Sequence, residues 1–305
     1  MHVVRRDDPR YMEAVVKKKS QEDPREIVIR EKTAAQMLKE EWARDAFARI
    51  RDIQIEYLKD AVAHADDQEH VHARTQNTVR ELSSLLRSSI VSGSEFLKEI
   101  PRGSPVLVAT NHLGAYKLVG IKPKEDIGVD IPGYDAMYPY LMYFSALAPV
   151  ADALGDTIYY VSEDFPGVFG DVHSAAGFVH VPPASIPIEG GRTAVLTEQT
   201  RATIIRHKNA AIVNFPEGGT SGKYTDLDIY DLDPFKTGGY VVASELGIRI
   251  VPVAQYFDKD KGMQLCVFDP VVPPQGASKD VYEHLAKNDQ EKMQAWLDVC
   301  RNRMK

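Results

Sequence analysis

The chain has few cysteines, no excess of basic residues and no apolar run of bilayer-spanning length. Cys266 and Cys300 are the two cysteines among 305 residues, so the sequence predicts no disulfide framework and favours a reducing cytoplasm. Its 37 basic and 44 acidic side chains give a net charge of −7, which argues against nucleic acid as a partner. Residues 1–10 are charged and hold no apolar core, so no secretory signal peptide is expected there.

The longest uncharged stretch, residues 136–151, is rich in Tyr, Phe, Met and Leu. It is shorter than the roughly 20 residues that span a bilayer, and two prolines interrupt it. Such a segment packs inside a core, or it lies at a lipid interface or lines an acyl tunnel, and both alternatives stay open. We therefore expect a cytoplasmic protein, with peripheral contact to a membrane as the open alternative.

The spacing of apolar residues divides the chain near residue 100. Within residues 1–100, apolar side chains recur every three or four positions over 34–63 and 78–98, which predicts a small helical region. From residue 101 to residue 305, short apolar runs alternate with helical segments at 193–207, 234–246 and 278–303. The runs suited to buried strands are 105–109, 157–161, 177–181, 210–215, 249–257 and 263–268. This alternation predicts an α/β fold with a mixed central sheet flanked by helices.

Three segments carry polar residues directly beside these apolar runs. The first, 106–112, reads VLVATNH and ends in Asn111 and His112. The second, 214–221, reads NFPEGGTS and presents Glu217 in a turn with two glycines and two hydroxyl residues. The third, 233–239, reads DPFKTGG, contains Lys236, and precedes a helix and the run IRIVPV.

In this order, the segments resemble the glycerol-3-phosphate and lysophospholipid acyltransferase superfamily, whose members form phosphatidic acid. That family has Asn-His after a strand, a Phe-Pro-Glu-Gly turn, a Pro-Phe-Lys-x-Gly helix start and a Val-Pro-Val strand. The resemblance covers about residues 105–257. It implies that residues 101–305 form an acyltransferase-like domain and that the protein acts in phospholipid biosynthesis.

The resemblance implies acyl transfer from a thioester, with acyl-CoA or acyl-carrier protein as co-substrate and no metal or other cofactor. His112 would act as the general base on a hydroxyl of a glycerol-3-phosphate or lysophospholipid-like acceptor, since histidine has an ordinary pKa near 6.5. A thiol leaves readily, so no covalent intermediate with the enzyme is needed. The residues expected to hold the acceptor in the first two segments are Asn111, Glu217, Gly218, Gly219, Thr220 and Ser221.

The expected acid partner of the histidine is missing from its usual place. The family has an acid five residues after the histidine, where this chain has Lys117, and a cation cannot accept a hydrogen bond from the ring. Asp135, which precedes an apolar stretch as the family's acid does, is the leading candidate. Asp126 and Asp130 are lesser candidates, and a chain with no catalytic acid is a further alternative.

A phosphate-binding arginine is also missing, because Thr220 stands at its position. Lys223, Arg192 or Lys236 would supply the charge, or the acceptor carries no phosphate. These departures leave two hypotheses open, an O-acyltransferase and a non-catalytic member of the same fold that binds an acyl chain or lipid. Elsewhere, the histidines and acids of residues 64–72 match no closed zinc pattern and predict a solvated loop.

Overall fold

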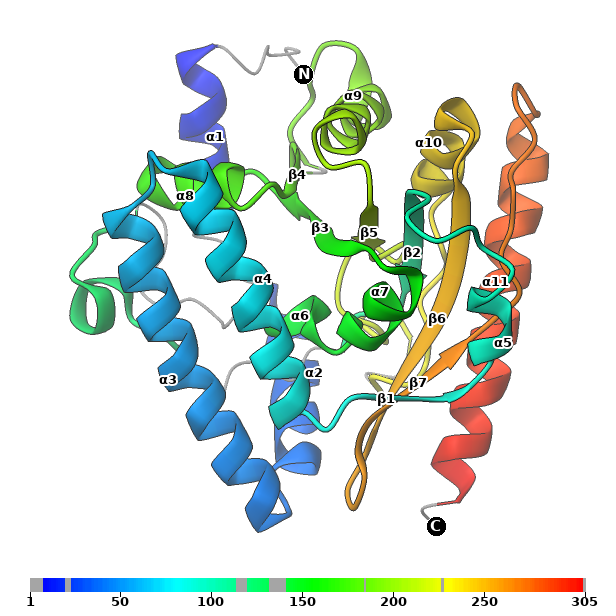
Figure 1. Cartoon of the computed structure of the whole chain (residues 1–305), viewed down its shortest axis with the longest axis horizontal. Coiled ribbons are helices and arrows are strands. Elements are labelled where there is room, and N and C mark those ends of the chain that lie inside the picture. Colours follow the sequence, from blue (N-terminus) through cyan, green and yellow to red (C-terminus); the bar gives the residue numbers. More distant parts are fainter. Residues whose placement is uncertain are drawn as a thin grey trace.

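A mixed seven-stranded sheet forms the centre of the molecule (Figure 1). The computed structural model describes residues 8–19, 23–113, 120–131, 141–183, 185–225 and 228–303. In sheet order, the strands are β1 (Ser89–Ser92), β7 (Gly262–Val267), β6 (Arg249–Asp258), β2 (Val106–Thr110), β5 (Ala210–Asn214), β3 (Thr157–Glu163) and β4 (Val179–Val181). β6 and β7 are antiparallel, whereas the other neighbours are parallel. The predicted mixed α/β fold is therefore confirmed.

The central strands are buried on both faces, as their continuous apolar sequences predict. Every residue of β2 and of β5 is buried. Val106 and Val108 of β2 belong to the main hydrophobic core, whereas Leu107 and Ala109 belong to a second core on the opposite face of the sheet. The six apolar runs correspond to β2 to β7 within about two residues at each end.

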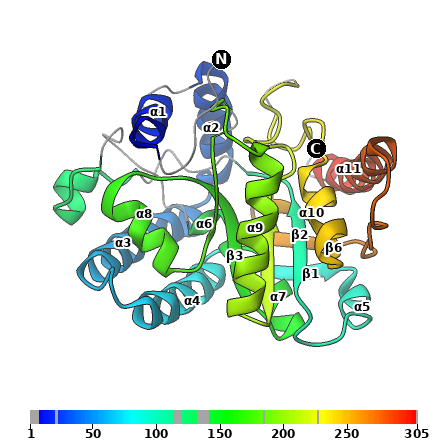
Figure 2. The same cartoon turned by 90° about the horizontal axis from the view of Figure 1, so that it is seen from above.

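Helices cover both faces of the sheet. Figure 2 shows α3, α4 and α8 to one side of the strands and α10 and α11 to the other. Residues of α9, α10 and the first half of α11 form the second core with the sheet. The helices are α1 (Pro9–Lys19), α2 (Pro24–Met37), α3 (Glu41–Ala63), α4 (Gln68–Leu85), α5 (Ser94–Leu97), the π-helical turn Pro123–Ile127, α6 (Met142–Ser145), α7 (Ala148–Leu154), α8 (Gly167–Ala175), α9 (Gly191–Arg206), α10 (Gly238–Leu246) and α11 (Lys279–Asn302).

The N-terminal third departs from the sequence prediction in one respect. The helical pattern over 78–98 ends early, because α4 stops at Leu85 and β1 and α5 follow. Arg87, just after this helix, has φ +52°, which is outside the helical range. Gly93 then lets the chain pass close to β7, because its φ is +78° and a Cβ there would lie 1.8 Å from the carbonyl oxygen of Val267. The chain therefore joins the sheet before residue 100. The predicted division into two domains at that point stays a prediction.

The apolar stretch 136–151 is described from residue 141 onward. That part forms α6 and α7, and Leu141, Phe144 and Leu147 are buried in the main core. Within the described ranges, no helix combines the length and apolar character that crossing a bilayer requires.

Candidate active site

The polar segments found in the sequence meet at one edge of the sheet. β2, β5 and β3 are parallel neighbours, with Ala109 beside Asn214 and Val213 beside Tyr160. Their carboxyl ends therefore lie side by side, and His112 follows β2 just as Glu217 follows β5. Such an edge is where open α/β sheets bind ligands.

A short hydrogen-bond network joins His112 to the Glu217 turn. The Ser221 hydroxyl donates to Glu217 Oε1 at 2.5 Å and accepts from the His112 backbone nitrogen at 2.9 Å. The Ser221 backbone nitrogen donates to the His112 carbonyl oxygen at 2.9 Å. The backbone of His112 is thus fixed to a turn more than a hundred positions further along the chain.

Glu217 shapes this turn with both of its oxygens. Its Oε1 also accepts a longer bond of 3.3 Å from the His112 nitrogen, and its Oε2 accepts from the Asp233 nitrogen at 2.8 Å. Burial raises the pKa of Glu217 to about 8, although these donors oppose the shift. Because Glu217 is only 2% exposed and its oxygens serve protein donors, it orders the turn. The predicted contact of Glu217 with the acceptor stays a prediction.

Asn111 likewise serves the framework. Its side-chain oxygen accepts from the Gln255 backbone nitrogen at 2.7 Å, and its amide nitrogen donates to the Gln255 carbonyl at 3.1 Å. Gln255 in turn donates to the Asn111 carbonyl oxygen. Asn111 is fully buried and ties the end of β2 to β6, so its position favours orienting the next residue over the predicted contact with a substrate.

The glycine turn leaves room for Lys236. Gly218 has φ +71°, and a Cβ there would lie 2.3 Å from the Lys236 ammonium nitrogen. Gly218 is exposed and Gly219 partly exposed, whereas Thr220 and Ser221 are buried. The open face of the turn therefore consists of glycine backbone with the Lys236 ammonium lying across it. The backbone nitrogen of Lys236 donates to the Pro216 carbonyl oxygen at 2.9 Å and holds the segment in place.

The three candidate cations have different surroundings. Lys223 is paired with Asp23 at 3.0 Å, and its side chain is only 11% exposed. Arg192, at the start of α9, lies 3.6 Å from Glu163. Desolvation, followed by the charges of Arg192 and Lys223, lowers the pKa of Lys236, which still keeps part of its surface exposed. Among the described residues, no carboxylate is within ion-pair distance of Lys236.

The His112 ring packs against Phe215, with ring centroids 4.5 Å apart. Lys117 and Asp135, the two residues on which the acid question depends, lie outside the described residues. Asp126 accepts two hydrogen bonds from Arg51 and one from the Lys122 backbone, so it is already held beside α3. Asp130 is exposed. Asp135 as the acid partner and a chain with no catalytic acid both stay predictions.

Two contributors to the site were missed in the sequence. Gln255 lies inside an apolar strand run, where nothing local marks it as the partner of Asn111. Asp233 begins the polar segment 233–239, but it contributes a backbone N–H, which no side-chain pattern reveals.

Away from the site, Asp60 of α3, the helix-ending His64 and His70 of α4 lie together, with His70 Nε2 2.8 Å from Asp60. The loop predicted over 64–72 is wrong beyond residue 67, because α4 begins at Gln68. These residues are remote in sequence from every segment of the site.

Chemically, the edge offers an imidazole held by its backbone, an exposed glycine turn and a cation for which the described part of the chain supplies no ion-pair partner. A base beside an anion-binding group suits the deprotonation of a hydroxyl on an anionic molecule.

Comparisons with known proteins give only distant structural likenesses. No protein-family model and no curated protein matches the chain. Among solved structures, the chain is similar to the 1-acyl-sn-glycerophosphate (LPA) acyltransferase PlsC from Thermotoga maritima, with a TM-score of 0.49 and 16% sequence identity. The match covers 84% of this chain and 93% of that chain. So distant a likeness assigns no activity.

Proposed function

We propose that the protein is an O-acyltransferase that moves a fatty acyl group from a thioester to a hydroxyl of a phosphate-bearing acceptor. The acceptor class is that of glycerol 3-phosphate or a lysophospholipid, and the donor is acyl-CoA or acyl-carrier protein. The observation that carries the proposal is the placement of His112 at the same sheet edge as the Gly218 turn with Lys236 across it. The ordered motif resemblance points in the same direction.

In this proposal, His112 takes the proton of the acceptor hydroxyl as its oxygen attacks the thioester carbonyl carbon. The new C–O bond forms the ester, the C–S bond breaks, and the proton passes from the imidazolium to the departing thiolate. Asn111 and Ser221 keep the backbone of His112 in place during this exchange. No covalent bond to the enzyme is formed.

Lys236 would bind the acceptor phosphate, with Arg192 as a second cation. A partly desolvated ammonium with no described carboxylate within ion-pair distance is stabilised by an anion. Lys223 is less suited, because Asp23 already neutralises it. A phosphate over Gly218 would meet backbone rather than side chains, which allows close approach.

The test is thiol release from an acyl-CoA in the presence of glycerol 3-phosphate or lysophosphatidic acid. We expect His112→Ala to lower kcat by roughly 10²- to 10⁴-fold, the usual contribution of a general base. The matched control is His284→Ala, which removes an exposed histidine of α11 and should leave the rate unchanged.

Lys236→Ala tests the acceptor assignment separately. It should raise KM for the phosphate-bearing acceptor by about tenfold, the effect of one charge-assisted contact, with little change for an uncharged monoacylglycerol. Equal thiol release by wild type and His112→Ala would overturn the catalytic proposal. If acyl-CoA still binds in that case, the non-catalytic lipid-binding hypothesis takes its place.

A further inference from the structure

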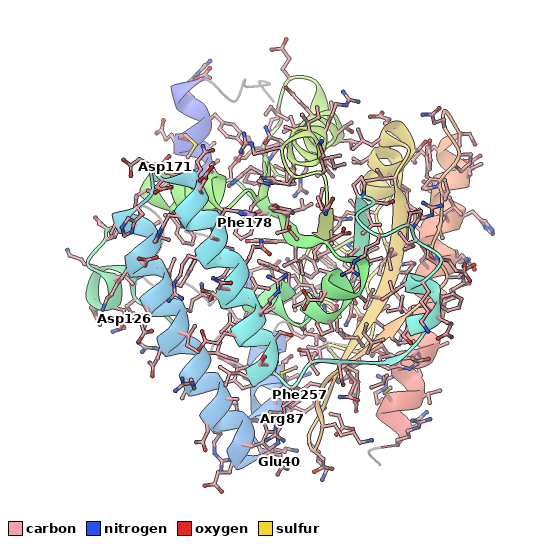
Figure 3. All side chains as sticks on the ribbon, viewed as in Figure 1. Glu40, Arg87, Asp126, Asp171, Phe178 and Phe257 are labelled. Atoms are coloured by element: carbon pink, nitrogen blue, oxygen red, sulfur yellow. The ribbon has the colours of Figure 1, made fainter. Side chains whose placement is uncertain are left out.

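The helices α3 and α4 form an antiparallel pair joined by a short turn. Figure 3 labels Glu40, just before α3, and Arg87, just after α4, near the same end of this pair, so the turn lies at the opposite end. There Asp60 lies in the last turn of α3, His64 ends that helix and His70 lies in the first turn of α4. We call these residues the hairpin cluster. It shares no residue with the proposed acyl-transfer site.

The hairpin cluster brings two imidazole nitrogens and a carboxylate within reach of one metal ion. One ligand atom from each residue lies within 4.8 Å of the others. His70 Nε2 is 2.8 Å from Asp60 Oδ2, and His64 Nδ1 is 3.4 Å from Asp60 Oδ1. Ligand atoms bound to a tetrahedral zinc ion at about 2.0–2.1 Å lie roughly 3.3 Å from one another. Small rotations of the side chains therefore suffice to bring the ligand atoms onto one ion.

The backbone of the turn holds the hairpin cluster together. The His64 nitrogen donates to the Asp60 carbonyl oxygen at 3.1 Å, and the Asp67 nitrogen donates to the His64 carbonyl oxygen at 2.8 Å. The Asp67 carboxylate caps α4 by accepting from the His70 nitrogen at 3.0 Å. Asp60 and His64 are four positions apart, which places them on one face of α3. Ligands arranged in advance bind a metal without the cost of ordering the chain.

The hydrogen bonds of the cluster identify the nitrogens that a metal would use. His64 Nδ1 is 2.9 Å from the Asp60 carbonyl oxygen, and His70 Nε2 faces the Asp60 carboxylate. A carbonyl oxygen and an ionised carboxylate only accept, so each of these nitrogens carries the proton of its ring. When a metal binds, that proton moves through solvent to the opposite nitrogen, and the neutral ring offers the vacated lone pair. Solvent reaches both rings, since the side chains of His64 and His70 are 46% and 39% exposed.

The chemistry of the ligands selects the metal. Imidazole nitrogens suit zinc, whereas magnesium and calcium prefer oxygen ligands. Two imidazoles and a carboxylate would leave a tetrahedral zinc ion one position for water, so the closed spacing of four protein ligands is not required.

Arg74 of α4 is the charge that opposes a metal. Its Nε lies 3.8 Å from Asp60 Oδ2, which is longer than a hydrogen bond. Both side chains are about one-third exposed, and ion pairs in such surroundings contribute little to stability. The guanidinium can therefore turn towards solvent when a metal binds the carboxylate.

We propose that the hairpin cluster binds a zinc ion and thereby links the end of α3 to the start of α4. The juxtaposition of the Asp60 carboxylate with the imidazoles of His64 and His70 carries the proposal. It goes beyond the proposed acyl transfer and uses separate residues. Its tests measure metal binding and stability, so their outcome is independent of whether the protein transfers acyl groups.

The first experiment is isothermal titration of the metal-free full chain, without added histidines, with zinc chloride and separately with magnesium chloride at neutral pH. We expect zinc to bind with a Kd of roughly 10 µM or tighter, and magnesium to bind at least about 100-fold more weakly. If zinc does not bind at this strength, or if magnesium binds as tightly as zinc, the proposal is overturned.

Substitutions then locate the zinc ion. His64→Ala and His70→Ala should each raise the Kd for zinc by about tenfold or more, and the matched control His284→Ala, which removes an exposed histidine of α11, should leave it unchanged. Arg74→Gln removes the opposing cation and should lower the Kd by roughly threefold. Equal Kd values for wild type, His64→Ala and His70→Ala would place the ion elsewhere and overturn the assignment.

Urea denaturation tests the link between the two helices. A metal that binds the folded chain and not the unfolded one stabilises the fold by mass action. Zinc at about ten times its Kd should raise the urea midpoint of wild type and leave that of His64→Ala unchanged. If zinc binds wild type without raising the midpoint, the unfolded chain binds it equally well. The assembled cluster is then not required for binding, and the proposal is overturned.

Discussion

The hydroxyl of Ser221 joins the carboxylate of Glu217 to the backbone of His112. It donates to Glu217 Oε1 at 2.5 Å and accepts from the His112 nitrogen at 2.9 Å. Ser221 is fully buried and Glu217 nearly so. Besides Asn111, the position of the proposed base therefore depends on a serine that has no direct part in the proposed chemistry.

Replacing this serine should cost stability. In Ser221→Ala, the His112 nitrogen keeps only the 3.3 Å bond to Glu217, and the buried carboxylate loses its shortest donor. Leaving buried polar groups poorly satisfied costs about 1–3 kcal/mol, so the free energy of unfolding should fall by that amount. Urea denaturation followed by circular dichroism measures it.

Ser84→Ala is the matched control. Ser84 is exposed near the end of α4, and its hydroxyl donates to the carbonyl of Arg80 in its own helix, so removing the hydroxyl should change stability by less than about 0.5 kcal/mol. Equal stability of Ser221→Ala and wild type would contradict the role assigned to the network.

Gly218→Ala should displace the Lys236 ammonium. The new Cβ would lie 2.3 Å from Nζ, and the lysine chain must move away from the turn. Under the proposed function, KM for a phosphate-bearing acceptor should rise by roughly tenfold, because the proposed phosphate contact is lost. Steady-state kinetics with varied acceptor concentration measures the change.

The positive φ of Gly218 adds a backbone cost that a control must reproduce. Gly276 has φ +65°, similar to the +71° of Gly218, and a Cβ there would meet nothing within 4 Å. Gly276→Ala should therefore show the backbone strain, about 1–2 kcal/mol, without the rise in KM. If Gly218→Ala and Gly276→Ala have a similar KM, Lys236 does not contribute to binding of the acceptor.

The fold was largely predictable because its central strands are buried on both faces. Continuous apolar runs such as those of β2 and β5 can be recognised as strands from the local sequence alone. The exception is β1, whose short sequence follows a helical pattern; none of its four residues is buried, and Ile90 alone among them is partly covered. Its pairing with β7 depends on a strand about 175 positions further along the chain, as the register of Ser89 with Gln264 shows.

The site was predictable in its location and less so in its roles. Motif spacing marked His112, Glu217 and Lys236, because each stands beside a strand end or a helix start. It could not reveal that Glu217 is enclosed by protein donors, since one of those donors is the backbone of Asp233. The hairpin cluster was missed, because its spacing matches no closed zinc pattern and its members meet only through the turn between α3 and α4.

Asp156 should make the protein less stable as the pH rises. Both of its carboxylate oxygens are buried without a hydrogen-bond partner among the described residues, and burial raises its pKa from 3.8 to about 7. The folded state therefore retains a proton that the unfolded state releases near pH 4. Between about pH 4 and pH 7, this residue should lower the free energy of unfolding by on the order of 1–3 kcal/mol.

Asp156→Asn removes this titration. The stability of the variant relative to wild type should be greater at pH 8 than at pH 4. The buried amide does not titrate, so any cost it has is the same at both pH values. Urea denaturation at the two pH values measures the difference, with Asp66→Asn at the exposed α3–α4 turn as control. A relative stability that does not change with pH would show that Asp156 ionises as freely in the folded chain as in the unfolded one.

His207 should act in the opposite direction. Its ring stacks on His72 at 4.8 Å and on Tyr159 at 4.9 Å, where the end of α9 meets α4 and β3. Desolvation, with the charges of His72 and Arg206, lowers its pKa from 6.5 to about 4. Below about pH 6.5 the unfolded state takes up a proton that the folded state refuses, so the stabilisation present above that pH is lost as the pH falls.

His207→Phe keeps an aromatic ring in the stack and removes the titration. Between pH 7 and pH 5, the free energy of unfolding of the variant should rise by about 1 kcal/mol relative to that of wild type. The difference is no larger because solvent screens the charge of the partly exposed His207. His284→Phe, which changes an exposed histidine of α11, should show no comparable gain. His72 and Tyr159 are present in wild type and in both variants. A gain in stability confined to His207→Phe therefore assigns the pH dependence to the ring of His207. If His207→Phe shows no gain, His207 takes up its proton without opening the contact between α4 and α9.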